Sequence, residues 1–144
     1  MLVEAAAWRP GDTRSAEEIL ADPANSVYVD EWGRVGDVGL MAEDDGGEGL
    51  GAGWYRVFTD WDHGYGYVEA SVPELTLAVK RGARGQGVGT ALLSALVERA
   101  RADDVPGLSL SVEQDNPARR LYERVGFRQV GRDGNAWTMR LDLS

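Results

Sequence analysis

The chain contains no cysteine and a single histidine, His63, among its 144 residues. Without thiols it can form no disulfide, no cysteine nucleophile and no cysteine-ligated metal centre. One histidine is too few for a histidine-based zinc cluster, so we expect no metal ion. The lack of disulfides agrees with a reducing compartment, and we therefore expect a cytoplasmic protein.

Basic residues are also scarce: 15 Lys and Arg face 24 Asp and Glu, which gives a formal net charge of −9. A nucleic-acid surface needs a basic stripe to meet phosphates, so we expect no nucleic-acid partner. No apolar run is long enough to span a bilayer and no signal-peptide pattern opens the chain, so we expect no membrane. The acidity either keeps a small protein soluble or lines a pocket for a cationic substrate.

The first part of the chain is predicted to be helical, within one domain expected over residues 1–144. Alanines favour a helix over Leu2–Trp8, and a capping-box pattern opens a short helix over Ser15–Ala21. Proline near the first helical position predicts a third helix over Asp22–Trp32, which the following glycine ends.

The pattern then changes to strands. Val35–Glu43 and Leu50–Phe58 flank a turn-rich stretch and predict a β-hairpin. Thr59–Ser71 mixes glycines, aspartates and aromatic residues, and we expect a mobile loop that leads into a strand. Over Leu75–Val79 large apolar residues alternate with smaller ones, which is typical of a half-buried strand.

The clearest helix is predicted over Gly87–Ala102. Its apolar positions recur at helical spacing: Val88, Ala91, Leu92, Leu93, Ala95, Leu96 and Val97. A strand over Leu108–Val112 and a short helix from Asn116 to Gly126 follow. Phe127–Gly131 and Ala136–Leu143 predict a final pair of strands, so the fold class is mixed α/β.

A glycine-rich loop, Arg84-Gly85-Gln86-Gly87-Val88-Gly89, lies between the predicted strand and the clearest helix. A helix N-terminus presents unpaired N–H groups and partial positive charge, which attract phosphate, and glycines let the backbone approach closely. Lys80 and Arg81 add cationic donors just upstream. The alternative is a tight turn that binds nothing. The spacing fits neither a Walker loop, which needs Gly-Lys-Ser/Thr, nor a dinucleotide fingerprint.

Two segments together resemble a known family. The glycine loop is similar to the Arg/Gln-x-x-Gly-x-Gly/Ala signature of the GCN5-related N-acetyltransferase (GNAT) superfamily. Downstream, Asn116-Pro117-Ala118-Arg119-Arg120-Leu121-Tyr122-Glu123-Arg124-Val125-Gly126-Phe127 resembles the family's Asn-x-x-Ala-x-x-Leu-Tyr-x-x-x-Gly-Phe segment. The two motifs occur in the right order with a strand between them, which is more specific than either motif alone.

The resemblance implies a mixed, mostly antiparallel central sheet flanked by helices. Family members open with a strand, whereas Met1-Leu2-Val3 already lies in helix-like sequence, so the first strand is in question. The implied activity is transfer of the acetyl group of acetyl-CoA to a primary amine by direct attack. The implied acceptor is a small molecule or a protein amine. A homodimer is consistent with the resemblance but is not required by it.

The resemblance also implies which residues bind the cosubstrate and act on it. The backbone of Leu77, Ala78 and Val79 is expected to pair with the pantetheine arm. The amides expected to wrap the pyrophosphate are those of Arg84, Gly85, Gln86, Gly87, Val88, Gly89 and Thr90. Asn116 is expected near the pantetheine, although asparagine before proline is also a good helix cap. Tyr122 is expected near the sulfur as general acid, although it could simply pack.

Acetyl transfer also needs a base, because an alkyl ammonium has a pKa of about 10.4 and must lose a proton before it attacks. Glu74 lies on the strand parity opposite Leu75 and could take this proton through water, or could be an exposed carboxylate after Pro73. His63 or water are the alternatives. The acidic residues Asp60, Asp62 and Glu69 could recruit a cation or be solvated charges. The aromatic candidates for the acceptor pocket are Trp54, Tyr55, Trp61, Tyr65 and Tyr67.

Two other classes of protein would use the same loop. One is an acyl-CoA-binding sensor or interaction module that does not turn over, against which the presence of Tyr122 counts. The other is a nucleotide-binding domain, against which the missing lysine and acidic metal partners count.

Overall fold

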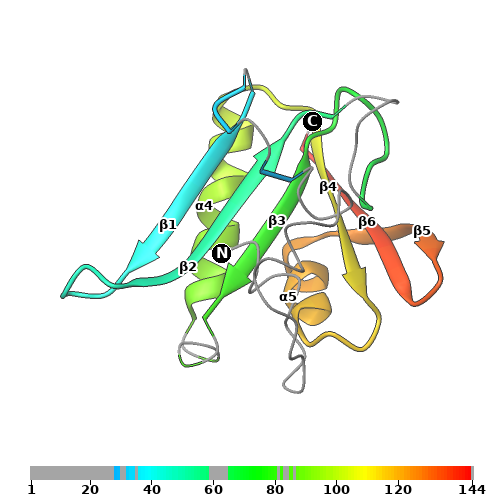
Figure 1. Cartoon of the computed structure of the whole chain (residues 1–144). Coiled ribbons are helices and arrows are strands. Elements are labelled where there is room, and N and C mark those ends of the chain that lie inside the picture. The colour runs from blue at the N-terminus through cyan, green and yellow to red at the C-terminus, as the bar shows by residue number, and fades with distance from the viewer. Residues whose placement is uncertain are drawn as a thin grey trace.

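The computed structural model of the chain describes residues 28–29, 32–34, 36–58, 65–80, 82, 85 and 87–143. These residues form six strands, which make up one central sheet, and two helices that pack against it (Figure 1). The elements are β1 (Val38–Glu43), β2 (Gly49–Arg56), β3 (Glu74–Val79), α4 (Val88–Ala102), β4 (Gly107–Glu113), α5 (Ala118–Val125), β5 (Arg128–Asp133) and β6 (Ala136–Asp142).

The six strands have the order β1-β2-β3-β4-β6-β5. All neighbouring pairs are antiparallel except β3 and β4, which run parallel. The predicted mixed fold with a mostly antiparallel sheet is therefore confirmed. Two antiparallel halves, β1-β2-β3 and β4-β6-β5, meet along one parallel seam.

The predicted third helix does not reach Trp32. Tyr28 and Val29 lie in a turn and Trp32 in a bend. The N–H groups of Gly33 and Arg34 donate to Asp37 Oδ2 (3.0 and 2.9 Å), and these bonds fold the chain back before β1 begins. The strand predicted from Val35 consequently starts at Val38 instead.

The other N-terminal predictions lie outside the residues that the structure describes. These are the helices over Leu2–Trp8 and Ser15–Ala21, the start of the third helix, and the question of a first strand.

Helix α4 packs on the first half of the sheet at two glycines. A Cβ on Gly53 would lie 2.6 Å from Leu96 Cδ1, and one on Gly51 would lie 3.2 Å from Leu92 Cδ1 and 3.2 Å from Val88 Cγ1. The helix thus approaches β2 where β2 has no side chains. The buried residues of α4 are Leu92, Leu93, Leu96, Val97 and Ala100. The predicted apolar face of α4 included Ala91 and Ala95, but both are exposed, so the buried face is narrower than predicted.

The opposite face of the sheet carries a second apolar cluster and a buried ion pair. Tyr28, Ala52, Trp54 and Phe58 form the cluster, with Tyr28 and Phe58 in edge contact at 6.0 Å between ring centroids.

The ion pair joins Arg56, at the end of β2, to Asp37. Arg56 Nε and Nη2 donate to the two carboxylate oxygens of Asp37 (2.9 and 2.8 Å), and the side chains are only 1% and 2% exposed. Arg56 also lies over the Trp32 ring, 5.5 Å from its centroid. A buried bidentate pair of this kind fixes geometry more than it adds net stability.

This pair predicts how stability responds to acid. Burial alone raises the pKa of the Asp37 carboxyl, but hydrogen bonds from Arg56, Gly33 and Arg34 and the charge of Arg56 outweigh it and leave the pKa lowered. Because the folded pKa lies below the unfolded one, the stabilisation is present above about pH 4 and is lost as the pH falls through the folded pKa. Asp37→Asn should cost roughly 3 kcal/mol of unfolding free energy at pH 7 and less at pH 3.

Urea denaturation at both pH values measures this difference. The matched control is Asp103→Asn, which removes an exposed i,i+4 pair with Arg99 (2.8 Å) and should cost about 0–1 kcal/mol. Equal losses for Asp37→Asn at pH 7 and pH 3 would contradict the prediction.

Candidate active site

Strands β3 and β4 pair at a single position, Glu74 opposite Ser109. Every other neighbouring pair of strands is matched at five or more positions. Beyond Glu74 the two strands diverge toward their C-terminal ends, as their arrowheads show (Figure 1). The seam between the half-sheets therefore opens into a V.

Alternate residues of β3 direct their backbone N–H and carbonyl groups toward this opening. The N–H of Lys80 donates to Leu50 on β2 (2.8 Å), whereas the carbonyl of Pro73 accepts from Ser109 on β4 (3.0 Å). Because strand backbone groups alternate in direction, Leu77 and Val79 present their peptide groups to the β4 side. Ala78 presents its own to β2, where it pairs with Ala52.

The N-terminus of α4 lies beside the end of β3. A Cβ on Gly89 would be 3.6 Å from Val79 and 3.4 Å from Leu121 of α5, so these three elements converge. Gly87 is the N-cap, with φ of 81°, and it supplies no capping side chain. The first-turn amides of Val88, Gly89 and Thr90 consequently have no cap from this residue.

The rest of the glycine loop is described only in part. Gly85 also has φ of 81°, and an added Cβ at Gly85 or Gly87 would meet nothing within 4 Å. The first turn of α4 contains no acidic residue, so its partial positive charge is not neutralised there. Lys80 pairs with Glu48 on the surface (3.2 Å). Arg81, Arg84 and Gln86 lie outside the described residues.

Tyr122 is fixed by the way α5 ends. Gly126 adopts φ of 119°, and its N–H donates to Glu123 (3.1 Å) while the N–H of Phe127 donates to Tyr122 (3.0 Å). These are the two bonds of a Schellman motif, which brings the rings of Tyr122 and Phe127 into contact at 5.8 Å. Tyr122 is only 6% exposed, and burial raises the pKa of its phenol.

Asn116 caps α5. Its Oδ1 accepts the N–H of Ala118 at 3.0 Å, while Pro117 already has helical φ and ψ. The capping interpretation of the sequence is thus confirmed. The bond holds the Asn116 side chain where β4 ends and α5 begins.

Glu74 is buried, not an exposed carboxylate after Pro73. It is 1% exposed, and its Oε2 accepts hydrogen bonds from Tyr28 Oη (2.6 Å) and the Gly66 N–H (2.9 Å). The same Tyr28 oxygen accepts the N–H of Tyr65 (2.8 Å). Burial raises the pKa of Tyr28, and the negative charge of Glu74 and the hydrogen bond to Glu74 raise it further. The phenol therefore remains a donor. Glu74 lies at the vertex of the V, on the face opposite α4.

Three residues around Glu74 escaped the sequence analysis. Tyr28 and Gly66 reach Glu74 from 46 and 8 residues away along the chain, and nothing in the local pattern indicates either contact. Ser109 did leave a signal, since it alternates with Leu108 and Leu110 and must face the Glu74 side. Its hydroxyl is buried and has no hydrogen-bond partner among the residues that the structure describes.

The remaining candidates divide between core, surface and undescribed positions. Tyr55 packs in the core with α4, Trp54 and Tyr67 belong to the opposite cluster, and Tyr65 is exposed. Glu69 forms a surface pair with Arg140 (3.1 Å). The candidates outside the described residues are Asp60, Trp61, Asp62 and His63.

The described residues also bear on metals and membranes. Within the ranges described above, no three carboxylate or histidine residues lie close enough to hold a metal ion. Neither described helix is both long and apolar enough to cross a membrane.

Comparison with known families and proteins gives one consistent result. Residues 4–127 match the model of the acetyltransferase (GNAT) family. The chain is 35% identical over 135 residues to the L-methionine sulfoximine/L-methionine sulfone acetyltransferase of Pseudomonas aeruginosa, covering 88% of this chain and 74% of that protein. It is 38% identical over 63 residues to the phosphinothricin N-acetyltransferase of Streptomyces coelicolor, covering 43% of this chain and 37% of that protein.

Solved structures agree on the fold. A GCN5-related N-acetyltransferase from Kribbella flavida superimposes with a TM-score of 0.69 at 22% identity, covering 99% of this chain and 87% of that one. A phosphinothricin acetyltransferase from Sinorhizobium meliloti, solved with acetyl-CoA, gives 0.62 at 23% identity and covers 75% and 62%. The chain belongs to the GNAT acetyltransferase family and is an acyltransferase.

Proposed function

We propose that this protein transfers the acetyl group of acetyl-CoA to the free amino group of a small amino-acid-like molecule. The observation that carries the proposal is the V-shaped seam between β3 and β4, which opens beside an α4 N-terminus that Gly87 leaves without a capping side chain. The seam offers backbone groups to an amide-containing arm. The helix terminus offers amides to phosphates.

The donor would bind along this seam. Its pantetheine amides would pair with the peptide groups of Leu77 and Val79, which are directed toward the opening. Ala78 would contribute by keeping β3 paired to β2. The amides of Val88 to Thr90 would hold the pyrophosphate, and we extend this role to the whole loop from Arg84 to Gly89. Asn116 would lie beside the arm through its position at the start of α5.

The reaction requires one bond to form and one to break. The neutral amine nitrogen attacks the thioester carbonyl carbon, and the carbon–sulfur bond then breaks to release CoA as a thiolate. The amine gives up one proton to a base, and the thiolate gains one from an acid. The products are an N-acetyl amide and CoA with a free thiol.

Tyr122 would be the acid. Its raised phenol pKa keeps it protonated at neutral pH, so it remains a hydrogen-bond donor while charge develops on the sulfur. An apolar environment also disfavours a bare thiolate, which makes proton transfer from a phenol easier than it would be in water. The Schellman motif would hold the ring in place for this step.

Glu74 would be the base, acting through water. It lies at the vertex of the V on the face opposite α4, so donor and acceptor would meet from the two sides of the sheet. The bonds from Tyr28 and Gly66 fix one oxygen of the carboxylate in position. His63 remains the alternative base.

The amino-acid-like acceptor rests on the relatives. The P. aeruginosa protein, similar over 88% of this chain, is named for L-methionine sulfoximine and L-methionine sulfone. The S. coelicolor protein is named for phosphinothricin, over a shorter match. All three are amino acids with oxidised sulfur or phosphorus in the side chain, and this is the acceptor class that we propose.

Ligand binding and turnover test the proposal directly. Acetyl-CoA should raise the melting temperature, because a ligand that binds only the folded state stabilises it, whereas ATP and NAD should not. Acetyl-CoA with L-methionine sulfone should then release free thiol, measured with a thiol reagent against leucine and spermidine as comparison acceptors. Binding without turnover of any amine would support an acyl-CoA sensor. Stabilisation by ATP or NAD alone would reject the acetyl-CoA site.

Tyr122→Phe tests the acid. It keeps the ring contact with Phe127 and removes only the hydroxyl, so the acetyl-CoA Kd should stay constant while kcat falls about 100-fold. The matched control is Tyr55→Phe, which removes a buried hydroxyl that has no partner among the described residues. Turnover of Tyr122→Phe equal to that of the control would remove the acid role.

Glu74→Gln and Glu74→Ala separate a base from a structural carboxylate. Gln keeps an oxygen that accepts from Tyr28 and Gly66, so stability should change little while kcat falls about 100-fold. Ala leaves two buried donors unpaired and should cost about 1–3 kcal/mol for each in urea denaturation. If Glu74→Gln retains full turnover, the carboxylate is only structural.

A further inference from the structure

The segment from Tyr65 to Val72, which we call the clasp, is joined to β3 by Pro73. The clasp belongs to the first half-sheet by chain connection, since it continues into β3. Its contacts, however, reach the second half-sheet at two places. It crosses the face of the sheet opposite α4, where Glu74 also lies.

The first anchor of the clasp is Gly66. Its N–H donates to the buried Glu74 carboxylate at 2.9 Å. A Cβ on Gly66 would lie 2.4 Å from the carbonyl carbon of Leu110 and 2.6 Å from the nitrogen of Ser111. Gly66 thus rests directly on the backbone of β4 while it is bonded to β3, and any side chain at this position would have to displace that backbone.

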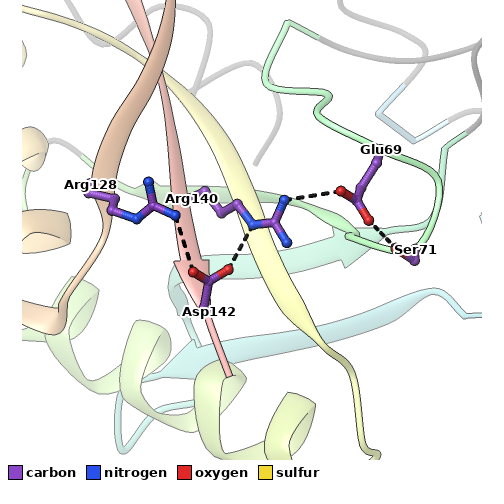
Figure 2. A network of polar contacts seen from close by, with 5 residues as sticks. All are labelled: Glu69, Ser71, Arg128, Arg140 and Asp142. Carbon is purple, nitrogen blue, oxygen red and sulfur yellow. Dashed lines mark hydrogen bonds and ion pairs between the residues drawn. The ribbon is translucent and has the colours of Figure 1, made fainter. Parts of the chain in front are cut away.

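The second anchor is Glu69. Its Oε2 accepts from Arg140 Nη1 of β6 (3.1 Å), and its Oε1 accepts from the Ser71 hydroxyl (2.6 Å) within the clasp. Figure 2 shows Arg140 held from its other side by Asp142 (2.8 Å), which also binds Arg128 of β5 (3.2 Å). Arg140 is therefore bound within its own half-sheet as well as to the clasp.

The side chains to which the two anchors bind, Glu74 and Arg140, lie on either side of the seam. The strand registers align Arg56, Glu74, Ser109, Arg140 and Arg128 in one row across β2, β3, β4, β6 and β5. Residues directly opposite one another on paired strands share a face of the sheet. Glu74 and Arg140 thus flank Ser109, and the clasp joins them across the single position at which β3 and β4 pair in the described part of the chain.

We propose that the clasp sets the angle at which β3 and β4 diverge, and that Gly66 and Glu69 are positioning residues for the V between the strands. The function of that V rests on the acetyl-CoA binding proposed above. One backbone pair cannot by itself define the angle between two strands. On the α4 face apolar packing resists their separation, and on the opposite face the clasp supplies the corresponding tie.

The length of β3 amplifies any error at the vertex. Val79 lies five residues beyond Glu74, which corresponds to about 16 Å along the strand. A rotation of about 4° at Glu74 would therefore move Val79 by about 1 Å, and a misplacement of that size can reduce a reaction rate about 100-fold. Residues that contact neither the donor nor the acceptor can consequently control how both are positioned.

The absence of cysteine from the chain permits a direct measurement. Met41 of β1 is 61% exposed and Arg124 of α5 is exposed, and they belong to opposite halves. Spin labels attached to the cysteines of a Met41→Cys, Arg124→Cys double variant would report the distance distribution between the halves by pulsed electron paramagnetic resonance. Three changes are compared in this labelled background. They are Gly66→Ala, Glu69→Gln and the control Gly131→Ala, whose Cβ would meet Thr138 at an ordinary 3.6 Å.

Gly66→Ala should broaden the distance distribution and raise the acetyl-CoA Kd about tenfold, whereas Gly131→Ala should change neither. Glu69→Gln keeps the side-chain shape and loses the ion pair, so it should give a smaller change in the same direction. It also carries the test alone if Gly66→Ala does not fold. Folded Glu69→Gln and Gly66→Ala with parental distance distributions would overturn the proposal. Because the distances are measured without ligand, a parent protein that fails to bind acetyl-CoA would reject the proposed function and leave this measurement intact.

Discussion

The single backbone pair between Glu74 and Ser109 is the constraint on which the rest of this structure depends. Two well-paired antiparallel half-sheets meet there, and the sheet then opens instead of continuing. Beyond this pair, the peptide groups that Leu77 and Val79 direct toward β4 do not form a ladder with that strand. Helices on one face and the clasp on the other keep the halves together despite the missing pairs. A site that is partly open by construction suits a long ligand that lies in it as a temporary strand.

The opposing demands on Glu74 illustrate how structure and chemistry share residues at this vertex. The carboxylate satisfies two buried donors, Tyr28 Oη and the Gly66 N–H, and so helps to shape the protein. We propose that it also accepts a proton during turnover. A base that is already hydrogen-bonded is well oriented, but its structural bonds must survive the change in protonation. Asn116 is similar, because it caps α5 with the side chain that we expect near the donor.

Local sequence patterns predicted the second half of the chain well because its elements are defined by neighbouring residues. The Gly-Phe pair after Tyr122 ends α5 by short-range hydrogen bonds, and the strand around Ser109 alternates in a simple way. The β1–β2 hairpin was equally local, since Asp44 caps its turn through Gly46 and Glu48. The elements on which we propose that the donor binds, the end of β3 and the start of α4, could be predicted for the same reason.

The acceptor side was less predictable because it is assembled from distant parts of the chain. Tyr28 meets Glu74 across 46 residues, and Arg140 meets Glu69 across 71. Burial of Glu74 could not be inferred from its own strand, where a carboxylate after proline reads equally well as exposed. The helix expected up to Trp32 was wrong for a related reason. Asp37 recruits the Gly33 and Arg34 amides because Arg56 fixes its position from another strand.

The glycines of β2 have a consequence for the size of ligand that the seam accepts. Gly51 and Gly53 let α4 settle close against the sheet, with Leu96 in the space that a side chain would occupy. The depth of this contact sets how far the N-terminus of α4 stands from the vertex of the V at Glu74. In a protein that binds phosphates at the first point and a thioester at the second, that spacing acts as a ruler for the linker between them. Two missing side chains on a strand that touches no ligand would thereby select for the length of the pantetheine arm.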